Sequence, residues 1–396
     1  MGLNAQPSGE RVHIGFFGLR NAGKSSVVNR VTGQTLSIVS DVKGTTTDPV
    51  QKAMELLPIG PVVIIDTPGI DDEGTLGAER VRRALRVLEK TDIAVLVTDS
   101  TRGLQSAEQE LIELFRKREI PFVIAHNKAD LTSVPAVMPE NEIYVSAAAD
   151  SNIRELKELI ARAVKPTEPE KRLVADLLAP NDTAVLVVPI DSAAPKGRLI
   201  LPQQQVIRDL LDIGAMPFVC RESELSETFA KLKEAPALVI TDSQVFPLVD
   251  RLTPPQVRLT SFSILFARYK GDLKQAAEGA KALEMIQDGD PILISEGCTH
   301  HRQCGDIGTE KLPAWIRQYT GKAPEFHFTS GTEFPEDVSG YKLIVHCGGC
   351  MLNAREMKSR LRSAVDQEIP MTNYGILIAY MKGILKRSMG ALEPIR

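Results

Sequence analysis

Residues 12–25 read VHIGFFGLRNAGKS, a short apolar run that leads directly into two glycines separated by four residues and followed by Lys-Ser. This pattern is typical of a phosphate-binding loop between a buried strand and a helix. Glycines let backbone N–H groups approach phosphate oxygens, and the helix N-terminus adds a favourable dipole. We expect Lys24 to bridge the terminal phosphates and Ser25 to hold Mg²⁺. The predicted nucleotide-binding residues of this loop are Gly18, Asn21, Ala22, Gly23, Lys24, Ser25 and Ser26.

Two further segments fit the phosphate side of such a site. Asp66-Thr67-Pro68-Gly69 follows the apolar run 62–65, so Asp66 is expected at the carboxyl end of a strand, within reach of Mg²⁺. Gly69 can offer its amide to a γ-phosphate. The segment Gly44-Thr45-Thr46-Thr47-Asp48 supplies a hydroxyl for the first mobile loop. The catalytic roles would fall to Lys24, Asn21, Thr46 and Gly69.

The base side of the site is predicted by two more segments. Asn127-Lys128-Ala129-Asp130 follows another apolar strand. A carboxylate at Asp130 can accept both the ring N–H and the exocyclic amine of guanine, a pair of donors that adenine does not have. Ser146-Ala147 after the run 143–145 would complete the pocket. The sequence therefore predicts a site for GTP and GDP.

The whole chain reads as three α/β units. Apolar runs at 12–17, 62–65, 93–97 and 122–125 alternate with amphipathic stretches, which predicts a parallel sheet covered by helices on both faces. The segment 165–171 carries prolines and charges and ends this unit. Two smaller alternating sets follow. We predict a GTP-binding domain at 1–168, a second domain at 169–266 and a third at 267–396, the last two with parallel sheets.

Composition excludes several classes. The 396 residues carry a net charge of −4, and 43% are hydrophobic, as in ordinary globular proteins. No apolar run approaches the roughly 18 residues that a membrane span needs, so no membrane association is expected. The N-terminus lacks a signal region, and five cysteines are too few for a disulfide framework. The expected location is the cytoplasm, and no nucleic-acid partner is expected.

Residues 11–165 resemble a translation-factor-class GTPase of the Era, Der and MnmE kind. In that family the residue after the DxxG element often does not position the hydrolytic water, and Ile70 here is apolar. In potassium-activated members an asparagine inside the phosphate loop helps to bind K⁺, and Asn21 occupies that position. The family pattern GxTxD favours Thr46 over Thr45 as the Mg²⁺ ligand, beside Ser25 and Asp66.

A second constellation consists of Cys298-Thr299-His300 and His346-Cys347-Gly348-Gly349-Cys350. Both segments follow apolar, strand-like runs. If those strands are parallel neighbours, their carboxyl ends lie at one sheet edge and three thiols can converge there. Gly348 and Gly349 leave room for backbone amides to point at sulfur. Asn353 with Glu356 resembles a capping box that opens a helix, whose N-terminus would stabilise a thiolate.

Three interpretations of these thiols compete: buried core cysteines, a structural zinc with Cys₃His ligation, and an iron–sulfur cluster. We favour a 4Fe-4S cluster on Cys298, Cys347 and Cys350, because three thiolates leave one iron with an open or weakly held position. His300 or His346 could supply the fourth ligand or act only in the surrounding hydrogen-bond network. Cys304 is interpreted as a bystander, and Cys220 as part of the core.

The combination of a GTPase domain, CxH, 45 residues and HCxxC resembles the HydF family of FeFe-hydrogenase maturation GTPases. The resemblance implies three domains, for GTP binding, dimerisation and cluster binding, and therefore a homodimer. It also implies a two-iron precursor, received from the radical enzymes HydE and HydG and delivered to apo FeFe-hydrogenase. Two other functions stay open: an RNA-associated GTPase of ribosome or tRNA maturation with a zinc site, and an enzyme of electron transfer or radical chemistry. The chain lacks a CxxxCxxC motif, which weakens the radical version.

Overall fold

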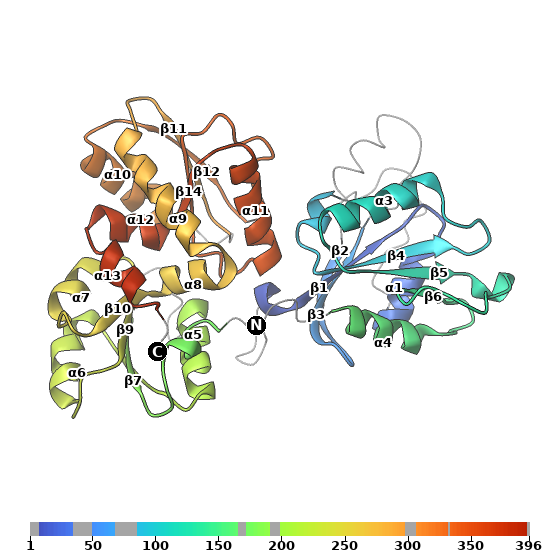
Figure 1. Cartoon of the computed structure of the whole chain (residues 1–396), viewed down its shortest axis with the longest axis horizontal. Helices are drawn as coiled ribbons and strands as arrows, with labels where there is room; N and C mark the ends of the chain where they lie inside the picture. Colours follow the sequence, from blue (N-terminus) through green and yellow to red (C-terminus); the bar gives the residue numbers. More distant parts are fainter. Residues whose placement is uncertain are drawn as a thin grey trace. The chain divides into compact units, whose positions relative to one another are not determined.

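The computed structural model describes residues 8–34, 50–67, 85–164, 172–190, 199–297, 306–331 and 333–393. The chain forms two compact units, Met1–Pro169 and Glu170–Arg396. Figure 1 shows the sheets and helices of both units. Within the described residues, no helix is long and apolar enough to cross a membrane.

The first unit is built on one six-stranded sheet with the strand order β2-β3-β1-β4-β5-β6. The central strand β4 is buried along its whole length, because helices cover both faces of the sheet. All neighbouring strands run parallel except β2, which pairs antiparallel with β3 and forms one edge. The parallel sheet predicted from the apolar runs is therefore mixed, because the unpredicted strand β2 runs antiparallel at its edge. The strands are β1 (Val12–Phe17), β2 (Val50–Leu56), β3 (Gly60–Asp66), β4 (Ile93–Asp99), β5 (Phe122–Asn127) and β6 (Glu142–Tyr144).

Helices lie on both faces of this sheet, as predicted. Helices α1 (Lys24–Thr32) and α4 (Ile153–Ala163) pack on one face, where Val27, Val28, Leu156 and Ile160 enter the core. Helix α3 (Ser106–Lys117) covers the other face with Leu111, Ile112 and Phe115. The apolar residues of α3 and α4 recur at helical spacing, so each helix buries one stripe against the sheet.

The second unit contains two four-stranded sheets, and both are parallel throughout. The first has the order β10-β9-β7-β8, with β7 (Thr183–Val187), β8 (Met216–Cys220), β9 (Leu238–Thr241) and β10 (Arg258–Ser261). The second has the order β12-β11-β13-β14, with β11 (Pro291–Ser295), β12 (Glu325–Thr329), β13 (Leu343–His346) and β14 (Met371–Asn373). The predicted fold of three α/β units, the last two with small parallel sheets, is confirmed.

Nine named α-helices accompany these sheets in the described part of the unit: α5 (Leu201–Asp212), α6 (Leu225–Lys231), α7 (Phe246–Leu252), α8 (Phe262–Lys270), α9 (Leu273–Ala280), α10 (Leu312–Thr320), α11 (Ala354–Asp366), α12 (Tyr374–Met381) and α13 (Leu385–Gly390). Helix α9 is followed directly by a 3₁₀ turn, Lys281–Met285. The predicted boundary at 266/267 falls within α8.

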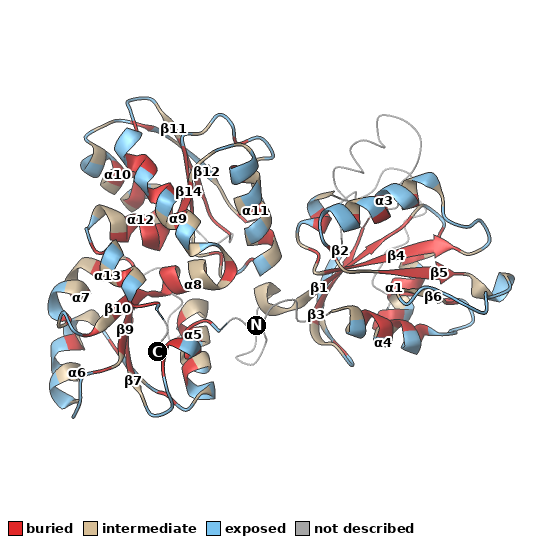
Figure 2. Cartoon of the chain, viewed as in Figure 1, coloured by how far each residue is buried: buried red, intermediate tan, exposed pale blue. Residues whose placement is uncertain are grey.

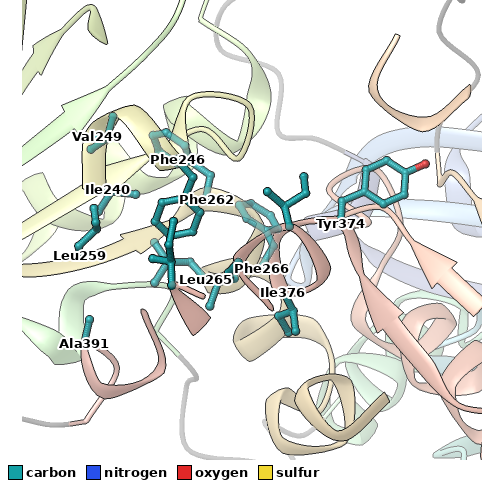
Figure 3. Packing of buried hydrophobic residues seen from close by; sticks show 14 of the residues in the cluster. Ile240, Phe246, Val249, Leu259, Phe262, Leu265, Phe266, Tyr374, Ile376 and Ala391 are labelled. Carbon is teal, nitrogen blue, oxygen red and sulfur yellow. The ribbon is translucent and has the colours of Figure 1, made fainter. Parts of the chain in front are cut away.

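One hydrophobic core runs through both sheets of this unit. Helix α8 contributes Phe262, Leu265 and Phe266 to it, and α12 is buried on nearly all sides, as Figure 2 shows. Figure 3 shows Phe262 and Phe266 of α8 between Leu259 of β10 and Ile376 of α12. Helix α8 follows β10 directly and packs in the core that the two sheets share.

Candidate functional site

The phosphate loop lies between β1 and α1, as predicted. Gly23 adopts φ +83°, and a Cβ there would lie 2.2 Å from Asn127 Nδ2, so only glycine fits. Lys24 begins α1, is buried and forms an ion pair with Asp66. Ser25 Oγ donates to the same carboxylate over 3.3 Å. The structure thus brings together Lys24, Ser25 and Asp66, the described residues predicted for the phosphates and Mg²⁺.

Four further residues were predicted to contact the phosphates, Mg²⁺ or K⁺, and the structure describes two of them. Asn21 is exposed and has φ +65°, and Ser26 is exposed at the start of α1. Thr46 and Gly69 lie outside the described residues. The placement of the Mg²⁺ and γ-phosphate groups that depend on them therefore stays a prediction.

The predicted base-binding residues converge at the carboxyl ends of β5 and β6. Asn127 Nδ2 donates to Ala22 O at 3.0 Å, and Asn127 Oδ1 accepts from the Ala147 amide at 3.1 Å. Ser146 Oγ donates to Asp130 Oδ1 at 2.5 Å. Asn127 thereby ties the phosphate loop to the Ser146-Ala147 segment, and these hydrogen bonds join the two halves of the predicted nucleotide site into one frame.

Asp99 belongs to this frame but was not singled out by the sequence analysis. It ends β4, and Lys128 Nζ donates to its carboxylate at 2.5 Å. Burial acts to raise the pKa of Asp99, but hydrogen bonds from Lys128 and Thr101 outweigh it and hold the pKa at about 2. Asp99 is therefore ionised at neutral pH and fixes the Lys128 side chain. Its signal in the sequence was an acidic residue two positions after the apolar run 93–97.

The sulfur-bearing segments also follow neighbouring strands. β11 pairs parallel with β13, and Ser295 is the register partner of His346. The Cys347 amide donates to Ser295 O at 2.9 Å, so the pairing extends one residue into the cysteine segment. The predicted arrangement, with both strand ends at one sheet edge, is confirmed. Cys298, His300 and Cys304 lie outside the described residues.

Two backbone amides point at the sulfur of Cys347. Gly297, the residue before Cys298, donates to Cys347 Sγ at 3.0 Å, and Gly349 donates at 3.4 Å. Burial raises the pKa of the Cys347 thiol to about 11, and these two hydrogen bonds act in the opposite direction. Asn353 caps α11 through the Glu356 amide at 2.8 Å, as predicted. The Gly349 amide reaches the sulfur as predicted for the glycines of this segment, whereas the contact from Gly297 was not predicted.

Cys350 lies beside a buried lysine. Lys270, the last residue of α8, donates to the carbonyls of Gly349, Cys350 and Leu352. Burial raises the pKa of the Cys350 thiol, and the positive charge of Lys270 acts against that rise. Lys270 could not be predicted from the sequence, because its partners are backbone carbonyls and leave no side-chain pattern.

His346 uses both ring nitrogens within the protein. Nδ1 donates to Cys347 O at 2.8 Å, which fixes the tautomer, and Nε2 accepts from Arg360 Nη1 at 3.0 Å. Burial, together with the charge of Arg360, lowers the pKa of His346 to about 3. Arg360 is itself buried and also binds Glu356 Oε1 at 2.8 Å. Of the two roles left open for His346, this geometry favours the hydrogen-bond network.

Further polar groups surround the same edge of the sheet. Tyr374 donates to Glu296 Oε1 at 3.3 Å, and both side chains are buried. Burial and the nearby charge of Glu296 raise the pKa of Tyr374 well above its ordinary value. Cys220 is buried in the core at the end of β8. Among the described residues, no group of three His, Cys, Asp or Glu side chains could hold a metal ion, and the third predicted thiolate falls outside them.

The fold and these two sites define a class: a P-loop GTPase joined to a cysteine-bearing α/β unit. Family models match the chain as a 50S ribosome-binding GTPase over residues 13–128, a hydrogen maturase F dimerization domain over 173–271 and a hydrogen maturase F tetramerization domain over 274–391. The two hydrogen maturase F domains together cover more than half of the chain. The chain belongs to the HydF family of hydrogenase maturases, and its domains imply GTP binding, GTP hydrolysis and self-association.

The curated relatives match a smaller share of the chain. The tRNA modification GTPase MnmE of Legionella pneumophila (strain Paris) is 34% identical over 155 residues, 38% of this chain and 34% of the relative. GTPase Der of Maridesulfovibrio salexigens is 41% identical over 125 residues, 30% of this chain and 27% of the relative. The chain thus spans about a third of the length of these relatives.

Solved structures of GTPases are also similar to part of the chain. The probable GTP-binding protein engB is 24% identical and covers 39% of this chain and 98% of its own, with a TM-score of 0.32. Era of Aquifex aeolicus, bound to GDP and aluminium fluoride, is 21% identical and covers 52% of this chain and 92% of its own, with a TM-score of 0.35.

Proposed function

We propose that this chain is a GTP-controlled carrier in hydrogenase maturation. It binds a 4Fe-4S cluster through Cys298, Cys347 and Cys350, receives a two-iron precursor beside that cluster and delivers it to apo FeFe-hydrogenase. The observation that carries the proposal is the hydrogen bond from the Gly297 amide to Cys347 Sγ at 3.0 Å. Gly297 directly precedes Cys298 in the chain. The contact therefore brings the segment that leads to Cys298 up to the sulfur of Cys347.

The described donors fit an iron–sulfur cluster. Cysteine thiolates hold such clusters in proteins, and N–H groups directed at sulfur help to set their potentials. Cys347 accepts from two amides, and the charge of Lys270 lies beside Cys350. When bound on three thiolates, the cluster would supply an iron whose fourth position exchanges ligands. His346 positions the Cys347 peptide, which leaves His300 as the candidate for that fourth position.

The GTPase unit would supply control. Ser25, Thr46 and Asp66 would hold Mg²⁺, and Lys24 and Gly69 would contact the γ-phosphate. Asn21 would bind K⁺ and so offset charge that develops in the transition state, giving a slow, potassium-activated hydrolysis. The convergence of Lys24 and Ser25 on Asp66 supports these roles. Nucleotide state at the loops 31–48 and 66–80 would then tune the contact with partners.

The partners follow from the family. HydE and HydG would supply the precursor, and apo FeFe-hydrogenase would accept it. Self-association as a homodimer is supported by the edge strand β8, where Met216, Phe218 and Val219 are 46%, 43% and 48% exposed. An apolar edge strand is a ready template for pairing with another chain.

Anaerobic reconstitution with iron and sulfide tests the proposal. The parent protein should gain the optical and EPR spectra of a 4Fe-4S cluster, and Cys347→Ala should lose both. Cys220→Ala is the matched control, because Cys220 is buried in the core at the end of β8. A colourless parent that carries zinc would contradict the proposal and favour the structural zinc interpretation.

A further inference from the structure

Lys270 is a charged residue buried within the core of the second unit. Its side chain is 2% exposed, and it ends α8 with its ammonium over the ring of Phe266, 5.5 Å from the centroid. Figure 3 shows Phe266 within the core of this unit. A lysine removed from water is costly unless its donors are satisfied. The position therefore needs a structural reason, which its hydrogen bonds supply.

Those hydrogen bonds go to one short segment. Lys270 Nζ lies 3.2 Å from Gly349 O, 3.0 Å from Cys350 O and 2.7 Å from Leu352 O. A neutral amine has only two N–H donors, so three carbonyl acceptors require the ammonium form. We define residues 347–352 as the sulfur loop. Its last carbonyls converge on a single positive charge that comes from a helix far earlier in the sequence.

We infer that Lys270 is a positioning residue for the sulfur loop: its ammonium holds Cys350 in place for ligation, and its charge acts on whatever the two cysteines bind. This inference rests on the proposed cluster site. Lys270 lies within the dimerization-domain match at 173–271, whereas the sulfur loop lies within the match at 274–391. The loop is therefore not self-contained, because a residue of the segment matched as the dimerization domain completes it.

The charge of Lys270 predicts a redox effect. Reduction adds a negative charge to a cluster, and a fixed positive charge nearby stabilises the reduced form. Removing that charge should make the midpoint potential more negative. If Lys270 only held the backbone, its loss would lower the yield of reconstituted cluster. It would not shift the midpoint potential of the cluster consistently to more negative values.

The first test uses the full-length protein without metal. Lys270→Met keeps the length of the side chain and removes the donors, so the sulfur loop should open more often. We expect alkylation of Cys347 and Cys350 by iodoacetamide to accelerate roughly tenfold, as the loss of hydrogen bonds to a charged group implies. The matched control is Lys281→Met, which removes an exposed lysine paired with Glu278. Equal alkylation rates in K270M and the parent would overturn the inference.

The second test uses the reconstituted protein and an EPR-monitored redox titration. K270M should show a more negative midpoint potential than the parent, and K281M should match the parent. Lys270→Arg retains the charge, so its potential should stay near that of the parent, although the larger guanidinium disturbs the loop and speeds alkylation. K270R also serves if K270M does not fold. Two results would contradict the inference. One is a midpoint potential of K270R that is as negative as that of K270M, and the other is a midpoint potential of K270M that equals the parent's.

The two tests separate this inference from the proposed function. If the parent protein binds no cluster, the proposed function fails, and the alkylation rates still decide whether Lys270 holds the loop. If the parent binds a cluster and the Lys270 variants behave like the parent in both measurements, only the inference about Lys270 fails.

Discussion

The amide of Gly297 donates a hydrogen bond to the sulfur of Cys347, 50 residues further along the chain, at a distance of 3.0 Å. The contact is possible because β11 and β13 are parallel neighbours in register. It brings the segment that leads to Cys298 against the cysteine that follows β13. The predictions about the sulfur site start from this contact.

Gly297→Ala should weaken cluster binding. A Cβ at this position would lie 2.8 Å from Leu352 Cγ and 3.5 Å from Gly349 Cα, so the sulfur loop would have to shift. We expect a destabilisation of roughly 1–3 kcal/mol, as for other overpacked sites, and less iron bound per chain. Urea unfolding and iron analysis check both effects. Gly340→Ala is the control, because a Cβ there meets open space. Full iron loading of G297A would contradict the importance of this close approach.

His346→Asn should destabilise the protein without removing the cluster. The variant takes away the ring nitrogen that accepts from Arg360, which is buried. An unsatisfied buried donor costs about 1–3 kcal/mol, measurable by urea unfolding. The EPR spectrum of the reduced, reconstituted variant should match the parent's. His327→Asn, at a half-exposed histidine of β12, is the control. An altered EPR spectrum in H346N alone would instead identify His346 as an iron ligand.

Asn21→Gly should abolish potassium activation of GTP hydrolysis. Asn21 has φ +65°, a conformation that glycine adopts without strain, so this change removes the side-chain amide and preserves the backbone. Hydrolysis rates are measured in K⁺ and in Na⁺ at equal ionic strength. The parent should be faster in K⁺, and N21G should show equal rates. Asn181→Gly makes the same change at φ +71° in the other unit. A parent without any K⁺ preference would refute the role of Asn21.

Asp99→Asn should weaken guanine-nucleotide binding by about tenfold, or about 1.4 kcal/mol, because Lys128 loses its anchor. The pKa of Asp99 is lowered from its ordinary value to about 2, so its carboxylate loses its charge only as the pH falls through that range. The ratio of parent to D99N affinities should therefore be constant from pH 5 to pH 8. Titration with a fluorescent GDP analogue measures it. Glu158→Gln, at an exposed pair with Arg154, should bind like the parent.

Much of the fold could be predicted from the sequence because its buried strands are continuous apolar runs. All strands flanking the two sites, β1, β3, β5, β11 and β13, were predicted in this way. The missed strands β2, β10, β12 and β14 all lie at sheet edges: β2 and β12 are partly exposed and polar, and β10 and β14 have four and three residues. Their apolar residues are too few or too scattered to give a period.

The site residues divide along a similar line. The phosphate loop, Asp66, Asn127 and the cysteine segments were predicted because their chemistry requires fixed residue types at fixed spacing. Lys270, Arg360 and Asp99 were not, because each acts on a partner distant in sequence. Lys270 and Arg360 occupy helices where a lone charge usually faces solvent, and only tertiary packing reveals that both are buried.

The central claim is that thiolates from two strand ends meet at one iron–sulfur cluster, and Cys298 tests it most directly. Anaerobically reconstituted Cys298→Ala should be compared with the parent by iron and sulfide analysis and by EPR of the reduced proteins. The account predicts four irons and four sulfides per chain in the parent, and loss of the 4Fe-4S signal in C298A. A C298A protein with the full iron content and the parent's spectrum would contradict it.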